Sequence, residues 1–333
     1  MEIERAFEES KGKSARAITA LIVMLIFFAL ISVYAGAVKF GFFEIFDPAN
    51  KEIRNIRLAR LLMAVIAGGG LSVTGAILQG LLRNPLCEPY VLGISSGAAL
   101  GAVSAISVGI GYTVFGFGIL PVFAFLGAAI TLFFIYRIAQ INGRLPLQNL
   151  LLSGVVIGAV LSSVVIFIDS FSQSQTLHSV MWWMLGSLQV FDLNLLFSVG
   201  SVVAIGVILS FMFHRELNAI SLGEEEALHL GIDIERVKKT LFFISALITG
   251  AIVSAAGMIG FVGLIVPHFM RLIVGPNYKV LIPASFLAGA IFLIVCDSLA
   301  RVAISPSEIP IGVITAIVGG PFFIYLLRKK SKV

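Results

Sequence analysis

Long apolar runs separated by short polar connections dominate the chain. Residues 17–38 contain no charged side chain, and further runs of similar character follow to the C-terminus. A helix needs about 20 mostly apolar residues to cross the hydrocarbon core of a bilayer. The pattern therefore predicts an all-α polytopic membrane protein with about ten transmembrane helices, in which residues 1–333 form a single transmembrane domain. The predicted spans are residues 17–38, 61–82, 91–108, 119–136, 147–168, 193–213, 241–259, 261–274, 280–295 and 309–327.

Composition leads to the same class of protein. Hydrophobic residues make up 59% of the chain and charged residues 12%, with a mean hydropathy of +1.05. A soluble domain carries about 25% charged residues, so a cytosolic enzyme and a disordered chain are excluded. The net charge of +5 does not indicate a nucleic-acid partner. Cys87 and Cys296 are too few for a disulfide framework and lack a metal-binding spacing.

The first apolar run has some features of a secretory signal peptide. Ala35-Gly36-Ala37 is similar to a cleavage site. However, the run is longer than the 7–15 apolar residues usual in a signal peptide. We therefore expect a retained transmembrane helix.

Lys and Arg in the connections predict the orientation. With the N-terminus in the cytoplasm, inner segments hold 17 of these residues and outer segments hold 6. The excess on the inner side places both termini in the cytoplasm of a plasma-membrane protein. Five of the six outer exceptions lie between residues 39 and 60, so this segment needs another explanation. The exceptions are Lys39, Lys51, Arg54, Arg57, Arg60 and Arg301.

Two connections carry an organised pattern of residues. The outer segment 169–192 contains an amphipathic stretch, 176–190, with Trp182 and Trp183. The inner segment 214–239 contains a predicted short helix with acidic residues in its first turn, where the helix dipole favours them. Gly231 suits a left-handed cap at its C-terminal end. We expect Ala227 and Leu230, three residues apart, to share one apolar face that docks on a partner. A solvated helix on the membrane surface is the alternative.

Motifs for covalent chemistry are missing from the sequence. It contains no phosphate-binding loop, no HExxH zinc motif, no nucleophile elbow and no paired carboxylates on one helix. His268 and Arg271 intrude near the inner end of one span, and we expect His268 to be a hydrogen-bonded structural residue. Ion-driven carriers usually need ionisable groups inside the membrane, and the predicted spans contain few such groups. The pattern favours a transport scaffold that is not an enzyme, holds no cofactor and takes its energy from elsewhere.

Small residues and breaks recur along the spans. Gly93, Gly97 and Gly101, and separately Gly154 and Gly158, have the four-residue spacing of close helix packing. Gly/Pro breaks follow two Gly-rich spans, at 84–89 and 260–268. The two preceding spans run in opposite directions, as an inverted repeat requires.

Several motifs occur in order along the chain: Arg57-Leu58-Ala59-Arg60, Gly75-Ala76-Ile77-Leu78-Gln79, Arg83-Asn84-Pro85-Leu86, Trp183-x-x-Gly186-Ser187, Gly257-x-Ile259-Gly260-Phe261, Asp297-x-x-x-Arg301 and Glu308-Ile309-Pro310. Over residues 20–327 the sequence resembles the FecCD-type permeases of iron-siderophore, haem and cobalamin ABC importers. The resemblance implies the BtuC-like fold of a type II ABC importer permease. It also implies a homodimer, two cytoplasmic ATPase subunits and an extracytoplasmic substrate-binding protein.

The resemblance implies roles for particular residues. Arg57, Arg60 and Arg301 match positions at which family arginines meet acidic residues of the binding protein. Gly223, Glu224, Ala227, Leu230 and Gly231 match the segment that couples to the ATPase. Ser153, Gly154, Gly158, Ser162 and Ser163, with Thr315 and Gly319, would face the dimer axis and line the translocation pathway. Packing between helices is the alternative role for these small residues. Ala59 stands where the family commonly has proline, and Cys87 where alanine is usual.

The expected function is the import of a metal chelate through the membrane, driven by ATP bound on other subunits. A permease of the same family for a small oxyanion such as molybdate stays open. An ion-coupled secondary transporter is a further alternative from a different class. A structural scaffold is disfavoured by the organised inner segment and the outer arginines.

Overall fold

A computed structural model describes residues 2–330 except 37–43, 45–46, 110–112, 115–116 and 191. Lys39 lies outside the described residues. The helices are α1 (Glu2–Tyr34), α2 (Lys51–Leu81), α3 (Ile94–Ser107), α4 (Ile119–Ala139), α5 (Leu147–Ser170), α6 (Ser174–Met184), α7 (Leu193–Met212), α8 (His214–Leu222), α9 (Glu224–His229), α10 (Ile234–Ala256), α11 (Val262–Val274), α12 (Tyr278–Val302) and α13 (Ile311–Lys330). Two 3-10 turns, η2 (Pro48–Asn50) and η3 (Pro89–Leu92), and one small antiparallel pair of strands, β1 (Thr113–Val114) and β2 (Phe117–Gly118), complete the description.

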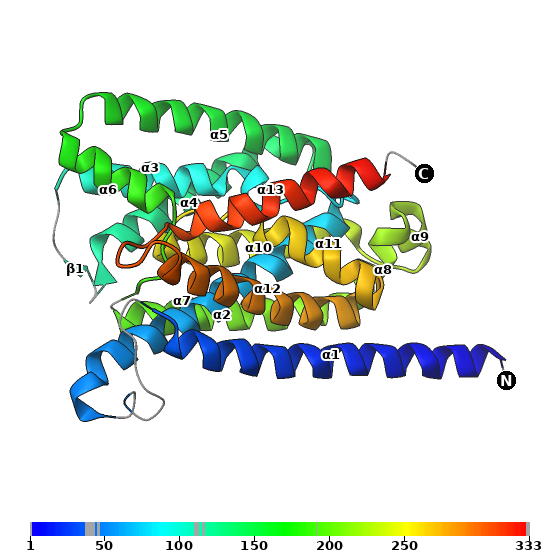
Figure 1. Cartoon of the computed structure of the whole chain (residues 1–333). Coiled ribbons are helices and arrows are strands. Elements are labelled where there is room, and N and C mark those ends of the chain that lie inside the picture. Colours follow the sequence, from blue (N-terminus) through cyan, green and yellow to red (C-terminus); the bar gives the residue numbers. More distant parts are fainter. Residues whose placement is uncertain are drawn as a thin grey trace.

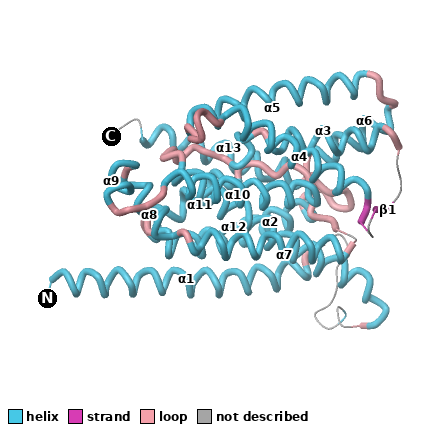
Figure 2. Tube along the Cα trace, turned by 180° about the vertical axis from the view of Figure 1, so that it is seen from behind, coloured by secondary structure: helices cyan, strands magenta, loops and turns pink. Residues whose placement is uncertain are grey.

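The long helices run side by side along one axis (Figure 1). Short helix α6 and strand β1 lie at one end of the bundle, called here the α6 end. Helices α8 and α9 lie at the other end, the α9 end, together with both chain termini (Figure 2). Helices α1 and α5 flank the bundle on opposite sides.

The predicted spans all fall on helices. Among the described residues, seven helices are long and apolar enough to cross a membrane, and α3, α11 and α13 contain shorter apolar helices. The predicted all-α membrane fold is therefore confirmed. The stretch around Pro267, the shortest prediction, is a real helix, α11.

Three helices continue well past the predicted spans into charged sequence. Helix α1 begins at Glu2, α2 begins at Lys51 and α12 ends at Val302. The expected outer connection 39–60 is therefore wrong over its last ten residues, which form the first turns of α2. A hydropathy reading ends a span at a charge, whereas α2 and α12 continue through arginines that bind other segments of the chain.

Helix α2 is the centre of the core. In its most apolar stretch 78% of the residues are buried, and it packs against α7, α10, α11 and α12. Two glycines bring the helices into backbone contact: a Cβ at Gly68 would meet the carbonyl oxygen of Gly289, and one at Gly75 would meet that of Gly263. Such close approach stabilises helix pairs in lipid, where no hydrophobic force drives them together.

The predicted glycine faces pack as expected. A Cβ at Gly97 would meet α4 at Gly127, and one at Gly101 would meet the carbonyl oxygen of Phe123. Gly93 faces the backbone of Gly154 on α5. In contrast, α1, α4, α5 and α7 turn largely unburied apolar faces outward. These faces suit the surrounding lipid chains.

Gly75→Ala is expected to destabilise the protein, because the new methyl group falls on backbone atoms that cannot rotate away. Overpacking of this kind costs about 1–3 kcal/mol. Gly320→Ala is the matched control, since no atom lies within 4 Å of its added Cβ. Thermal unfolding of the purified proteins in detergent measures the difference. Equal melting temperatures for the two variants would contradict the close contact.

Candidate functional site

Two arginines and two carboxylates form one ion-paired cluster near the α6 end. Arg60 Nε lies 2.6 Å from Asp297 Oδ1, and Arg60 Nη1 lies 2.7 Å from Glu308 Oε2. Arg301 Nε lies 2.9 Å from the other oxygen of Asp297. Asp297 is 1% exposed, and Arg60 and Arg301 are each 5% exposed. Because burial removes water, each of these charges depends on its partners.

Arginine side chains also bind the last carbonyl groups of α1. Arg301 donates from Nη1 to the carbonyl oxygen of Ala35 at 2.6 Å and from Nη2 to Ser32. Arg57 donates from Nη1 to the carbonyl oxygen of Val33 at 2.8 Å. The last carbonyls of a helix have no partner within the helix, and its dipole favours a cation there. Part of the unusual outer positive charge is therefore used inside the protein.

The three arginines that the resemblance matches to contacts with a binding protein, Arg57, Arg60 and Arg301, lie buried within this chain. All three residues are at most 7% exposed. Burial could not be inferred from the sequence, because it arises from α1 and the carboxylates of α12 and its following loop. A direct contact between these arginines and a binding protein stays a prediction.

The segment predicted to couple with a partner forms α8 and α9. Gly231 adopts the expected left-handed conformation, with φ of +77°, and Glu224 begins the acidic first turn. Gly223 is buried, and a Cβ there would meet the carboxylate of Glu226.

The apolar face of this segment differs from the prediction. Ala227 is fully buried, so it does not share an exposed ridge with Leu230. Leu230 is the C-terminal cap of α9 and is 68% exposed, so the two residues differ in burial although they are three apart. The exposed apolar residues are Leu222, Leu228 and Leu230, at 74%, 61% and 68% exposure, and we call them the leucine ridge.

Helix α9 is tied to the start of α10 and beyond it. Lys238 is buried, and its Nζ lies 2.7 Å from Glu224 Oε1 on α9 and 3.7 Å from Glu235 Oε1. Glu235 in turn accepts a hydrogen bond from the backbone N–H of Leu145 at 2.8 Å. Leu145 lies in the loop between α4 and α5. A short chain of polar contacts therefore connects the ridge segment to the start of α5.

The small residues predicted to line a pathway lie mostly within helix contacts. Ser153, Gly154, Gly158, Thr315 and Gly319 are buried. Ser162 and Ser163 are exposed, and the Ser162 hydroxyl lies 3.3 Å from Ser96 Oγ. Within one chain these positions have a packing role, and a pathway role stays a prediction.

The two Gly/Pro breaks meet each other inside the bundle. The Glu88 carboxylate accepts a hydrogen bond from the N–H of Phe261, and the Tyr90 hydroxyl accepts one from the N–H of Ile259 at 2.8 Å. Phe261 has a φ of +70°, which is unusual for a residue other than glycine. Side chains from one break thus satisfy the backbone groups freed at the other, as buried backbone requires.

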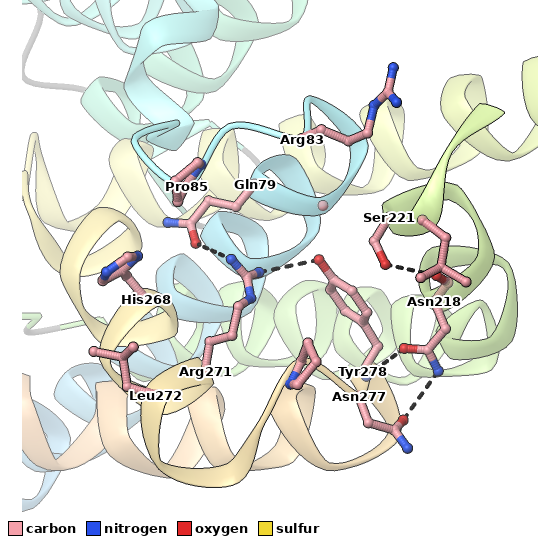
Figure 3. Close-up of a pocket in the computed structure, with 13 residues that line it drawn as sticks. Gln79, Arg83, Pro85, Asn218, Ser221, His268, Arg271, Leu272, Asn277 and Tyr278 are labelled. Carbon is pink, nitrogen blue, oxygen red and sulfur yellow. Dashed lines mark hydrogen bonds between the residues drawn. The ribbon is translucent and has the colours of Figure 1, made fainter. Parts of the chain in front are cut away.

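A pocket of about 660 Å³ opens at the α9 end, between the end of α2, α8, α11 and the start of α12 (Figure 3). Arg271 points into it between Gln79 and Tyr278. Its Nη1 lies 3.4 Å from Gln79 Oε1, and its Nη2 lies 3.2 Å from the Tyr278 hydroxyl. His268 also lines the pocket. Among the described residues, no group of three or more His, Cys, Asp or Glu side chains could hold a metal ion.

The model of the FecCD transport family matches residues 24–329 of this chain. The chain belongs to the FecCD transport family. Its assignment to this family confirms the resemblance found in the sequence motifs.

Relatives of this FecCD protein include transport permeases from distant organisms. It is 41% identical to the cobalamin import system permease protein of Halobacterium salinarum, over 91% of this chain and 79% of the relative. It is 36% identical to the hemin transport system permease protein of Yersinia pestis, over 94% of this chain and 95% of the relative. A solved structure described as an inward-facing conformation of a metal-chelate type ABC transporter matches with a TM-score of 0.84 and 29% identity, over 95% of this chain and 99% of that one.

Sequence reasoning missed the carboxylates that pair with the arginines, although both stand in the motifs of this FecCD permease. Asp297 and Glu308 stood in the motifs without a role, although the four-residue spacing of Asp297 and Arg301 is a signal for an ion pair on one helix. Lys238 gave no signal, because its burial depends on how α9 folds back.

Asp297→Asn is expected to destabilise the permease strongly, because it leaves two buried arginines without their shared carboxylate. Removing one partner of a buried ion pair costs about 3–5 kcal/mol. Glu308→Gln is the matched control. Its side chain is 39% exposed, so water replaces much of the lost interaction and the cost should be about 1 kcal/mol or less. Thermal unfolding in detergent checks the ranking, and a milder effect for Asp297→Asn would contradict the cluster.

Proposed function

We propose that this chain is the membrane permease subunit of an ATP-driven importer for a metal chelate. The leucine ridge carries the proposal, because its three exposed side chains belong to a segment that Lys238 fixes to α10. Exposed apolar groups held in place outside the lipid-facing helices are typical of a docking surface. Relatives named as permeases of cobalamin and hemin transport systems support the same role.

Three kinds of partner complete the proposed transporter. Two ATPase subunits bind the leucine ridges at the α9 end and supply the energy. A substrate-binding protein delivers the chelate at the α6 end. A second copy of the chain packs against α5, whose exposed face carries Val155, Val156 and Val160 together with the hydroxyls of Ser162 and Ser163. That face combines an apolar contact with a weakly polar lining for the substrate.

A bulky chelate fits this lining better than a small oxyanion does. Cobalamin and hemin, for which the relatives are named, are large and bind by extended contact. An oxyanion such as molybdate is small and needs dense hydrogen-bond donors or cations around it. The exposed face of α5 offers hydroxyl and apolar groups instead.

Reconstitution into proteoliposomes with the ATPase and binding-protein partners tests this function. Cobalamin, hemin, ferric siderophores and molybdate are offered in turn, with ATP or with an ion gradient alone. We expect uptake of one class of chelate, only with ATP. Uptake driven by an ion gradient without ATP would establish a secondary carrier, and uptake of molybdate alone would establish an oxyanion permease.

Leu230→Asp is expected to reduce both ATPase co-purification and ATP-driven uptake at least about tenfold, because burying a carboxylate without a partner costs more than about 1.4 kcal/mol. Leu230→Met is the control, since it keeps an apolar side chain of similar volume. Both variants should reach the membrane in equal amounts. Full uptake by Leu230→Asp would show that the ridge is not a docking surface.

Single-cysteine labelling tests the proposed orientation, with both termini in the cytoplasm. The native thiols give little background, because both are buried, and burial raises the pKa of the Cys87 thiol to about 12. An impermeant maleimide added to intact cells should label Ser307→Cys, near the α6 end. It should label Glu225→Cys, on α9, only in inside-out vesicles. The reverse labelling pattern would overturn the orientation.

A further inference from the structure

The pocket at the α9 end has a cation at its floor and no carboxylate among its described lining residues. Arg271 projects from α11, and Arg83 stands at the mouth with its guanidinium directed away from Arg271 (Figure 3). Polar groups of Asn218 and Asn277 form the opposite side. The pocket is therefore electropositive and able to hydrogen-bond.

The hydrogen bonds of Arg271 leave most of its binding capacity unused. Its two partners, Gln79 Oε1 and the Tyr278 hydroxyl, are neutral, and the distances of 3.4 and 3.2 Å are long for bonds to a cation. A guanidinium carries five N–H donors in a planar fork that matches a carboxylate. By contrast, Arg60 at the other end of α2 holds two carboxylates at 2.6 and 2.7 Å. The comparison indicates that Arg271 is arranged to receive an anionic group from another molecule.

The position of the pocket points to the source of that group. Leu222, at the pocket wall, is also the first member of the leucine ridge. A protein that covers the ridge therefore comes to lie over the mouth of the pocket. Helix α8, which contributes Asn218, Ser221 and Leu222, connects the two surfaces directly.

We propose that this pocket receives an acidic side chain of the ATPase subunit, which pairs with Arg271 while the leucine ridge supplies the apolar contact. This inference rests on the proposed function, since it assumes that an ATPase subunit docks at the ridge. Apolar burial at the leucine ridge then contributes affinity, and the ion pair in the pocket fixes the orientation of the ATPase on the membrane protein.

Binding of the purified ATPase subunit to the permease in nanodiscs of phosphatidylcholine tests the proposal, measured over a series of salt concentrations. For the wild type we expect the dissociation constant to rise with salt. Arg271→Gln should bind about tenfold more weakly at low salt, because one partner of a desolvated pair is gone, and should show a shallower salt dependence. Arg271→Lys should retain part of the salt dependence, because it keeps the charge but loses the planar fork.

Two further variants separate charge from structure. Tyr278→Phe removes one internal hydrogen bond of Arg271 while keeping the Arg271 charge, and it should retain the salt dependence that Arg271→Gln loses. Lys279→Gln removes a neighbouring exposed cation outside the pocket, and it should change the affinity little. If Arg271→Gln binds like the wild type while Leu230→Asp does not, the pocket proposal is wrong and the ridge role stands.

An anionic lipid headgroup is the competing occupant. Addition of phosphatidylglycerol to the nanodiscs distinguishes it. If the lipid competes for Arg271, it should weaken ATPase binding to the wild type but not to Arg271→Gln. This result would support an acidic ATPase group in the same pocket. Stronger ATPase binding with the lipid, lost in Arg271→Gln, would assign the pocket to lipid and overturn the proposal. Failure of the ATPase to bind even the wild type would refute the proposed function itself.

Discussion

Direct contact between the backbones of α2 and its neighbours holds the permease together. Gly68 lies against Gly289 of α12, and Gly75 lies against Gly263 of α11. Lipid chains are as apolar as the side chains they surround, so close packing replaces hydrophobic burial as the force between helices. Since α2 carries Arg60 near one end and Gln79 near the other, the same contacts position the ion-paired cluster and one wall of the pocket at the α9 end. A shift of α2 would disturb both at once.

The two ends of the bundle treat positive charge in opposite ways. At the α6 end, Asp297 is shared by two arginines, and carbonyl groups of α1 accept hydrogen bonds from Arg57 and Arg301. At the α9 end, Lys238 holds α9 in place, whereas the partners of Arg271 among the described residues are neutral. Charge at the first end therefore stabilises the fold, and in our proposal Arg271 at the second end is left for a partner protein. Arg60 and Arg301 pair with carboxylates of the same chain, whereas the carboxylate proposed for Arg271 belongs to another subunit.

Hydropathy was sufficient for the approximate place of the apolar helices, because a continuous apolar run has few alternatives to a membrane helix. It failed at Arg57 and Arg60, where the helix continues through charges whose acceptors lie far away in the sequence. The glycine spacing of Gly97 and Gly101 predicted close packing, since the absence of a side chain has one geometric consequence. The spacing of Ala227 and Leu230 did not predict a shared exposed face, because the packing of α9 against the rest of the fold buries Ala227 and leaves Leu230 exposed. Sequence spacing predicted contacts well within long regular helices. The ion-paired cluster and the pocket could not be predicted, because their residues come from segments far apart in the sequence.

The attachment of α1 has a consequence for how the chain is assembled during synthesis. Helix α1 is scarcely buried along its apolar stretch, and its end is held by Arg301, which lies 266 residues later than the Ala35 carbonyl that it binds. The end of α1 is therefore not fully anchored until α12 has been translated. Arg57 arrives early, with α2, and provides a provisional hold through Val33. A ribosome that stalls before α12 therefore releases a protein in which the end of α1 can bind Arg57 but lacks its contacts with Arg301.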